Sequence, residues 1–247
     1  MSRHPIQTTQ TQVEPPASER ERDHTDNKTA GAPASTGPTD PLPRARHFLL
    51  GAVVVNCVLQ LILPDRVSLG EWWLGWPLLE APLGLAGFIA LRHERNFARE
   101  GVRTLVRVLL IVMVLAVSFN TAMLLSLLAP SNNPNGIDLL LSCAAVLTMN
   151  ILTFGVVYWW IDSGGPAARR DPNNTRHDLQ FPQDVEAEPW QPRPEDYLYT
   201  SYTNVFAFSP TDTMPLTRRA KGIFTLQSAV ALLTMLVTLG LAVNNLT

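Results

Sequence analysis

Charged residues are scarce in this sequence of 247 residues: Asp, Glu, Lys and Arg make up 16% of it, against about 25% in an average soluble domain. Five long stretches carry almost no charge. They cover residues 48–64, 72–91, 104–129, 137–161 and 222–243. Uncharged apolar runs of this length exclude an ordinary soluble enzyme and predict a polytopic membrane protein.

Cysteine is also rare, and the two cysteines, Cys57 and Cys143, both lie inside apolar runs. We interpret them as packing residues, not as a disulfide or metal ligands. The five histidines are scattered without the spacing of a metal site, and a net charge of −2 offers no basic patch for nucleic acid. No motif for nucleophilic catalysis, metal hydrolysis or nucleotide binding is present. The sequence therefore predicts no enzyme, no metal and no cofactor.

The N-terminal segment, residues 1–46, lacks Phe, Trp and Tyr and contains seven prolines. It has too little apolar surface to offset the conformational entropy that ordering would cost. The sequence predicts that this segment is a disordered tail.

A helix needs about 20 mostly apolar residues to cross a bilayer, and backbone amides in lipid must be paired within their own segment. The sequence thus predicts an all-α fold with about five transmembrane helices plus one short re-entrant or interfacial element. The predicted spans are residues 47–64, 71–91, 104–129, 137–161 and 222–243. The predicted regions are the tail, a four-helix region 47–162, a proline-rich loop 163–221, and the last helix with its stub, 222–247.

Basic residues predict the orientation, because they gather on the cytoplasmic side of membrane proteins. Of the 19 Lys and Arg residues, 18 fall in the tail, in 92–107 and in 163–221, and only Arg66 falls in a segment on the other side. With an odd number of spans, the N-terminus is predicted in the cytoplasm and the C-terminus outside the inner membrane. The expected partners are the lipid bilayer and a second copy of the chain.

Within the loop region, residues 197–208 form an apolar and aromatic stretch of about 12 residues, which is too short to span a bilayer. Pro210 and Pro215 end this stretch, and Arg218, Arg219 and Lys221 precede the last span. The pattern predicts a re-entrant or interfacial element.

This region resembles the pore hairpin of bacterial potassium channels. The resemblance lies in Tyr-x-Ser-Tyr-Thr at 199–203, in Thr211-Asp212-x-x-Pro215, and in the apolar helix that follows. It implies a short pore helix, a returning segment and an inner helix. The runs FGVVYWWIDSGGP, FPQ and AFSPTDTMPLTRRAK also look like an uncharacterised family of bacterial multi-pass membrane proteins, a resemblance that implies no activity.

The five positions of the channel filter read Ala-Phe-Ser-Pro-Thr at residues 207–211, without the two glycines of that family. Pro210 fixes φ near −65°, so the inward carbonyl rings of a potassium filter cannot form. If the hairpin surrounds a pore, its lining residues are predicted to be Ser209, Thr211 and Asp212. The sequence thus favours a channel-like or transport-related protein with a degenerate pore hairpin. A non-conducting scaffold that docks a partner is the alternative.

Glu80 lies near the middle of the second predicted span, between Pro77 and Pro82. An acidic side chain at the bilayer centre costs about 3 kcal/mol on insertion scales and should face the bundle interior. Two interpretations remain open. Glu80 is a proton or cation site in a locally broken helix, or it is a structural residue, either a neutral side chain hydrogen-bonded to Asn56, Asn120 or Asn150 or one that lies near the interface if the span slides.

Other polar residues in the spans are interpreted as helix-packing features. The sequence predicts interhelical hydrogen bonds from Asn120, Asn150 and Gln227. Small residues also recur every four positions on the third span, at Ser118, Ala122 and Ser126. A stripe of this kind allows close helix approach, so we expect it to be buried against a neighbour.

Overall fold

The computed structural model describes residues 41–63, 75–92, 99–126, 136–185, 190–207, 209 and 212–244. Residues 1–40 of the predicted disordered tail lie outside the described residues. The last six residues of the tail, 41–46, are helical, because helix α1 runs from Pro41 to Ile62. Proline is well suited to the first turn of a helix, where its missing N–H would have no partner.

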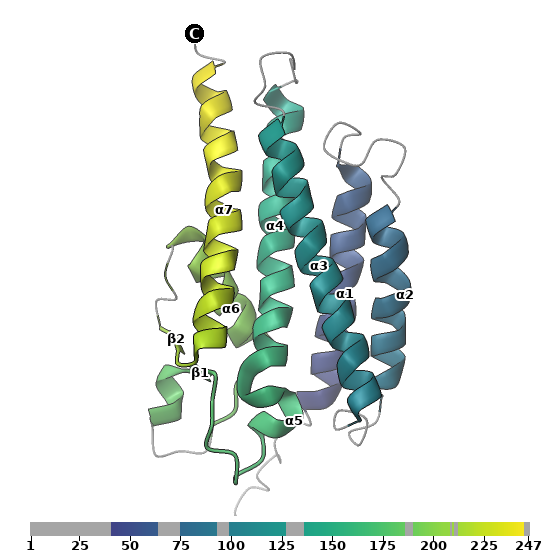
Figure 1. The fold of residues 1–247 in the computed structure, drawn as a ribbon, viewed down its shortest axis with the longest axis vertical. Helices are drawn as coiled ribbons and strands as arrows, with labels where there is room; N and C mark the ends of the chain where they lie inside the picture. Colours follow the sequence, from purple (N-terminus) through teal and green to yellow (C-terminus); the bar gives the residue numbers. More distant parts are fainter. Residues whose placement is uncertain are drawn as a thin grey trace, which may run out of the picture. The chain divides into compact units, whose positions relative to one another are not determined.

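The architecture is all-α, as predicted, apart from one two-stranded pair. Five long helices form the bundle, and consecutive ones run in opposite directions (Figure 1). They are α1, α2 (Gly75–Ala90), α3 (Glu100–Ser126), α4 (Gly136–Ile161) and α7 (Arg218–Asn244). Each coincides with one of the five apolar runs of the sequence.

Three of the described helices are long and apolar enough to cross a membrane: Glu100–Ser126, Gly136–Gly164 and Arg218–Gly240. These candidate spans indicate a multi-pass membrane protein. The apolar part of α1, Arg46–Ile62, is shorter. Helix α2 has 16 residues, a length of about 24 Å against a hydrocarbon core of about 30 Å. By length and composition, the described helices therefore support three of the five predicted spans.

Helix α4 lies at the centre of the packing, in contact with α1, α3, α7 and the shorter helix α6 (Pro194–Phe206). Every residue from 153 to 161 is buried. A helix that is apolar all round is typical of a position surrounded by protein. The core around this part of α4 includes Phe154, Tyr158, Leu109, Met113 and Leu49.

Two glycines permit the closest helix contacts. A Cβ atom at Gly84 of α2 would lie 2.6 Å from Cγ1 of Val53 on α1, and one at Gly155 of α4 would lie 3.3 Å from Cα of Leu198 on α6. Only a residue without a side chain allows the backbones to approach this closely. These contacts hold α2 against α1, and α6 against α4.

The predicted small-residue stripe on α3 does not have this role. Ala122 and Ser126 are exposed, and Ser118 is half-buried. The prediction that this stripe is a buried packing face is wrong, because α3 buries a bulkier face instead. That face includes Met113, Val117, Asn120 and Leu124.

The segment after α4 folds into short elements that we call the cap, residues 162–185. It contains the 3-10 helix η3 (Asp162–Gly164), α5 (Pro166–Arg169), strand β1 (Leu179–Gln180) and the 3-10 helix η4 (Pro182–Val185). Strand β1 pairs antiparallel with β2 (Met214–Pro215), with Leu179 opposite Pro215. Prolines of the predicted proline-rich loop stand at the first positions of α5, η4 and α6, where they are compatible with a helix.

Helix α6 lies along α4 and leads the chain back into the bundle, as Figure 1 shows. Leu198 contacts Gly155, and the hydroxyl of Ser201 donates to the carbonyl of Ile151 at 2.8 Å. Ile151 lies ten residues before the end of α4, a rise of about 15 Å. The chain then returns to β2 beside the cap, and the Thr200 and Thr213 hydroxyls, 2.9 Å apart, join the two limbs. Helix α6 and the described residues that follow it, 207, 209, 212 and 213, therefore form a hairpin.

Candidate functional site

Glu80 is fully buried, and its only hydrogen bond within the described part of the chain comes from Gln60. The Gln60 Nε2 donates to Oε1 of Glu80 at 3.0 Å. Oε2 of Glu80 has no partner among the described residues. The sequence offered Asn56, Asn120 and Asn150 as partners, but none of them bonds to Glu80 in the described structure. Helix α2 also continues through Pro82, so the expected local break is not seen.

Two neighbouring amides on α1 have the same unbalanced bonding. The Nδ2 of Asn56 donates to Oγ1 of Thr153 on α4 at 2.8 Å, while its Oδ1 has no partner among the described residues. Gln60 donates to Glu80, and its own Oε1 is likewise unpartnered among them. A buried acceptor without a partner costs about 1–3 kcal/mol. Three buried oxygens on α1 and α2 thus retain their capacity to accept a donor or a cation.

Two further buried polar groups, one on α2 and one on α3, are also incompletely bonded among the described residues. Nε1 of Trp76, one turn before Glu80 on α2, has no partner among the described residues, and neither has Nδ2 of Asn120 on α3. The rings of Trp76 and Phe119 lie 5.9 Å apart, which places this part of α3 beside α2. Asn120 is buried as expected, but the described residues supply no interhelical hydrogen bond to its amide nitrogen.

Gln227 on α7 is the centre of a second polar cluster, and its bonding is complete. Its Nε2 donates to Oδ1 of Asn150 at 3.1 Å and to the hydroxyl of Ser201 at 2.7 Å. Its Oε1 accepts from Nδ2 of Asn204 at 2.8 Å and from the Tyr158 hydroxyl. This cluster joins α4, α6 and α7 at mid-length and fixes the hairpin against both long helices.

The two regions connect into one line of polar side chains, which we call the polar array. Hydrogen bonds join Glu80 to Gln60, Asn56 to Thr153, and Asn150 to Gln227. One helical turn separates Gln60 from Asn56 on α1, and another separates Thr153 from Asn150 on α4. Residues three or four apart face the same side of a helix. The array therefore crosses the bundle from α2 through α1, α4 and α7 to α6.

The predicted pore-lining residues lie elsewhere. Ser209 and Asp212 are exposed on the returning limb of the hairpin. Thr211 lies outside the described residues. The structure thus brings Glu80, Asn150 and Gln227 into one array and leaves Ser209 and Asp212 outside it.

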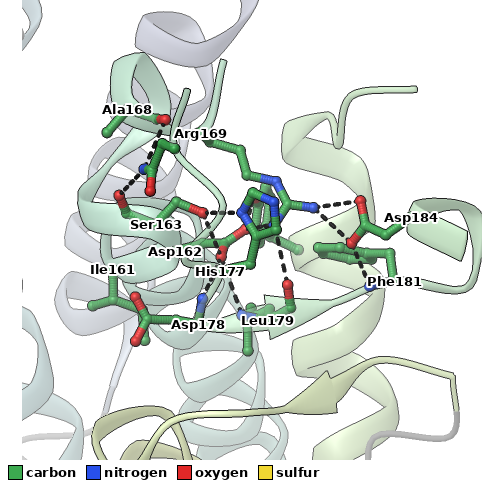
Figure 2. A network of polar contacts seen from close by, with 12 residues as sticks. Ile161, Asp162, Ser163, Ala168, Arg169, His177, Asp178, Leu179, Phe181 and Asp184 are labelled. Atoms are coloured by element: carbon green, nitrogen blue, oxygen red, sulfur yellow. Dashed lines mark hydrogen bonds and ion pairs between the residues drawn. The ribbon is translucent and has the colours of Figure 1, made fainter. Parts of the chain in front are cut away.

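A third polar network, which the sequence analysis missed, fixes the cap to the end of α4 (Figure 2). Its centre is Asp162, which is fully buried. One carboxylate oxygen accepts from the backbone N–H groups of Asp178 and Leu179, both at 3.1 Å. The other accepts from the hydroxyl of Tyr197 on α6 at 2.8 Å. Burial and the adjacent Asp162 raise the pKa of Tyr197 well above its usual value, so the hydroxyl remains a donor.

Arg169 extends this network towards η4. Its guanidinium lies 3.4 Å from Asp162 and forms two bonds, of 2.6 and 2.7 Å, to the carboxylate of Asp184. It also stands over the ring of Phe181 at 5.8 Å. Arginine suits this position because its several N–H donors reach different partners: one nitrogen bonds to Asp184, and another donates to the Leu179 carbonyl at 3.1 Å. The buried arginine is thereby compensated by two acidic groups.

The turn between α4 and α5 explains the Asp-Ser-Gly-Gly-Pro sequence. Ser163 has φ of 57°, and Gly164 and Gly165 have φ of 86° and 118°. Glycine adopts this region freely, whereas Ser163 requires support. Oγ of Ser163 lies 2.7 Å from Nδ1 of His177, and its carbonyl accepts from Asn174 at 3.1 Å. Three consecutive positive φ values reverse the chain and direct the cap back under α4.

Basic residues from separate segments meet at this end of the bundle. A guanidinium nitrogen of Arg103, in the first turn of α3, donates to the Gly164 carbonyl at 3.0 Å. Arg219, in the first turn of α7, donates to the Ile161 carbonyl at 2.5 Å and to Asp178 at 3.2 Å. The starts of α3 and α7 and the end of α4 therefore lie together. This is the same grouping of basic segments that the orientation prediction used.

The described residues contain no group of three or more His, Cys, Asp or Glu side chains placed to hold a metal ion. Comparisons with known proteins found no matching family model, curated protein or solved structure.

Proposed function

We propose that this chain is an inner-membrane protein that moves a small cation across the bilayer. In this proposal α1 to α4 and α7 all cross the membrane, the α6 hairpin is re-entrant, and the protein is not an enzyme. The observation that carries the proposal is the polar array. Apolar helices in lipid have no need of such a line of buried amides, and intramembrane acidic residues are typical of ion and proton pathways.

The position of the array supports this function. Asn150 lies about 21 Å from one end of α4 and about 17 Å from the other, by the helical rise. Asn150 is therefore at the depth where substrate and ion sites of transporters are found, whereas Gln60 and Glu80 lie nearer the ends of α1 and α2 that are adjacent in sequence. The array also ends on α6, through the bonds from Gln227 to Ser201 and Asn204. Movement of the hairpin and the state of Glu80 would thus be linked through the hydrogen bonds of the array and the single helical turns of α1 and α4 between them.

The potassium-channel resemblance adds a role for the hairpin. Helix α6 occupies the place of a pore helix, and the returning limb carries Ser209 and Asp212 on its exposed side. In a homo-oligomer these residues, with Thr211, would surround a common axis. Their side chains would then favour cations without selecting potassium, because a carbonyl filter is absent from this sequence.

A flux measurement tests the function. Purified protein in liposomes should dissipate an imposed sodium or proton gradient, and Glu80→Gln should abolish this flux. Glu100→Gln is the matched control, since the Glu100 side chain is 75% exposed at the start of α3, and it should retain the flux. Asp212→Ala separates the two routes: loss of flux places the pathway at the hairpin, and unchanged flux places it at Glu80.

The proposed orientation is tested separately. Alkaline phosphatase fused after Thr247 should be active, and the same fusion near Asn174 should be inactive, if the cap is cytoplasmic. The reverse pattern would place the hairpin on the outer side and overturn the orientation.

A non-conducting scaffold is the second candidate. The complete bonding of the Gln227 cluster and of the Asp162 network favours it, since both fix α6 firmly in place. Absence of flux under every gradient would establish this alternative over the first.

A further inference from the structure

We infer that Asn56, Gln60 and Glu80 form a binding site for one dehydrated sodium ion. The inference that sodium is also the transported ion rests on the proposed function. Binding of sodium at this site can be tested without transport. The carrying observation is the three unpartnered oxygens of these residues. Asn56 and Glu80 are fully buried, and Gln60 is 4% exposed.

The hydrogen bonds determine which atoms face the site. Asn56 uses its nitrogen on Thr153, and Gln60 uses its nitrogen on Glu80. Each amide therefore has its donor committed and its oxygen available. Asn56 and Gln60 are neighbours on one face of α1, four residues apart. The Gln60–Glu80 bond brings the carboxylate of α2 to the same place.

The charge of the group indicates a monovalent ion. Glu80 is the one acidic side chain of this set, and the other two ligands are neutral amides. Carboxylate and amide oxygens are the ligands that hard cations prefer. A divalent ion would retain an uncompensated charge in the bundle interior, which is costly in a medium of low dielectric constant.

The number of free oxygens favours a metal ion over a proton. A proton on Glu80 would neutralise the carboxylate and leave the oxygens of Asn56 and Gln60 without partners. One metal ion would satisfy all three oxygens together. The tight packing of α2 on α1, where Gly84 meets Val53, leaves little freedom for the helices to separate around a larger ion. Sodium is therefore preferred to potassium.

The site can be tested by chemical labelling of the full-length protein in detergent. Dicyclohexylcarbodiimide modifies carboxyl groups in apolar surroundings, and mass spectrometry of the peptides locates the label on Glu80. The label should be absent in Glu80→Gln. With sodium at about ten times its dissociation constant, labelling of Glu80 should slow about tenfold relative to choline at equal ionic strength. Potassium should protect much less.

Variants separate ligands from general packing. Asn56→Leu and Gln60→Leu should each raise the sodium concentration needed for half-protection. Thr121→Val is the matched control, because it removes a buried contact between α3 and α7, the 3.2 Å pair with Thr234, and keeps all three oxygens. Its half-protecting concentration should equal that of the unmodified protein.

Thermal unfolding gives a second measurement that requires no reaction at Glu80. Sodium should raise the melting temperature relative to choline, and Glu80→Gln should abolish this increase. Equal labelling and equal melting temperatures in sodium, potassium and choline would overturn the inference and leave proton transport through Glu80 possible. Sodium binding without flux in liposomes would instead retain the site and overturn the proposed transport function.

Discussion

Two fully buried carboxylates, Asp162 and Glu80, have opposite surroundings. Asp162 accepts hydrogen bonds from two backbone N–H groups and the Tyr197 hydroxyl, and it pairs with Arg169. Glu80 accepts one hydrogen bond, from Gln60, and its second oxygen has no partner among the described residues. Burial alone therefore does not show whether the hydrogen-bonding capacity of a buried acid is fully used.

The difference lies in the remaining capacity to accept. Both oxygens of Asp162 accept hydrogen bonds, from backbone groups of the cap and from Tyr197 on α6. Asp162 directly follows α4, so its carboxylate joins the end of α4, the cap and α6. Glu80 and the two amides beside it each have one oxygen without a partner among the described residues. A buried polar group that is fully bonded contributes to stability, whereas one that lacks partners reduces stability and is typical of binding sites. Four substitutions test this contrast.

Asp162→Asn should have the largest effect on stability. The amide nitrogen of the new Asn cannot accept a hydrogen bond, so the backbone N–H groups or the Tyr197 hydroxyl beside it would lose their acceptor. Arg169 would lose one of its two anionic partners. Breaking a buried ion pair of this kind costs about 3 kcal/mol, measured as the free energy of unfolding in detergent. Asp171→Asn, on an exposed loop position, should change it by less than about 0.5 kcal/mol. Equal effects would show that the Asp162 network does not hold the cap.

Gln227→Leu should have the second-largest effect. It leaves Asn150, Ser201, Asn204 and Tyr158 without their shared partner, and we expect a loss of about 2 kcal/mol in the free energy of unfolding. Ser228→Ala, which removes one bond of 3.2 Å to Asn204 at the edge of the cluster, should cost about 0.5 kcal/mol. The ratio of the two losses measures how strongly the cluster fixes α6. A ratio near one would contradict a central role for Gln227.

Gly155→Ala should have a smaller effect and an opposite sign to the same change at Gly51. Alanine normally stabilises a helix by about 1 kcal/mol relative to glycine, and nothing lies within 4 Å of a Cβ at Gly51. At Gly155 the Cβ would meet the Leu198 backbone at 3.3 Å, so α6 must shift at a cost of about 2 kcal/mol, which outweighs the helix gain and leaves a net loss of about 1 kcal/mol. Calorimetry of both variants checks this. Stabilisation by both would show that α6 is not closely packed on α4.

Glu80→Gln should have the smallest effect, less than about 0.5 kcal/mol, because an amide of the same shape still bonds to Gln60 and no network depends on the charge. The same unfolding measurement applies. A loss comparable to that of Asp162→Asn would make Glu80 a structural residue and remove the contrast between the two acids.

Much of the fold could be predicted from the sequence. The five apolar runs locate all five long helices, because apolar length is a local property. The grouping of basic residues also anticipates that the starts of α3 and α7 meet the end of α4. By contrast, the prediction that the small-residue stripe on α3 is buried was wrong. The spacing of small residues shows that a helix could approach closely, but it does not show whether a helix lies there. The glycines that permit close contact are Gly84 and Gly155.

The candidate site was harder to predict than the fold. Glu80 stands out in the sequence as an acid in an apolar run, but its partner Gln60 has no such signal, because glutamine near a helix end is ordinary. Asp162 and Arg169 were missed for a related reason. Both lie in a polar region that the sequence presents as a proline-rich loop, and their pairing with Asp184 and Tyr197 joins residues up to 35 positions apart.

The sequence by itself determined the class of this protein, the number and place of its long helices and the end at which its charges gather. These features follow from hydropathy and charge along the chain. Contacts with residues that are distant in the sequence do not change them. Tertiary structure alone decided which buried polar groups find partners. Hydrogen bonding depends on distances of about 3 Å between side chains on different helices, and such distances exist only after the helices have packed. That packing completes the bonding of Asp162 and Gln227 and leaves free oxygens at Asn56, Gln60 and Glu80.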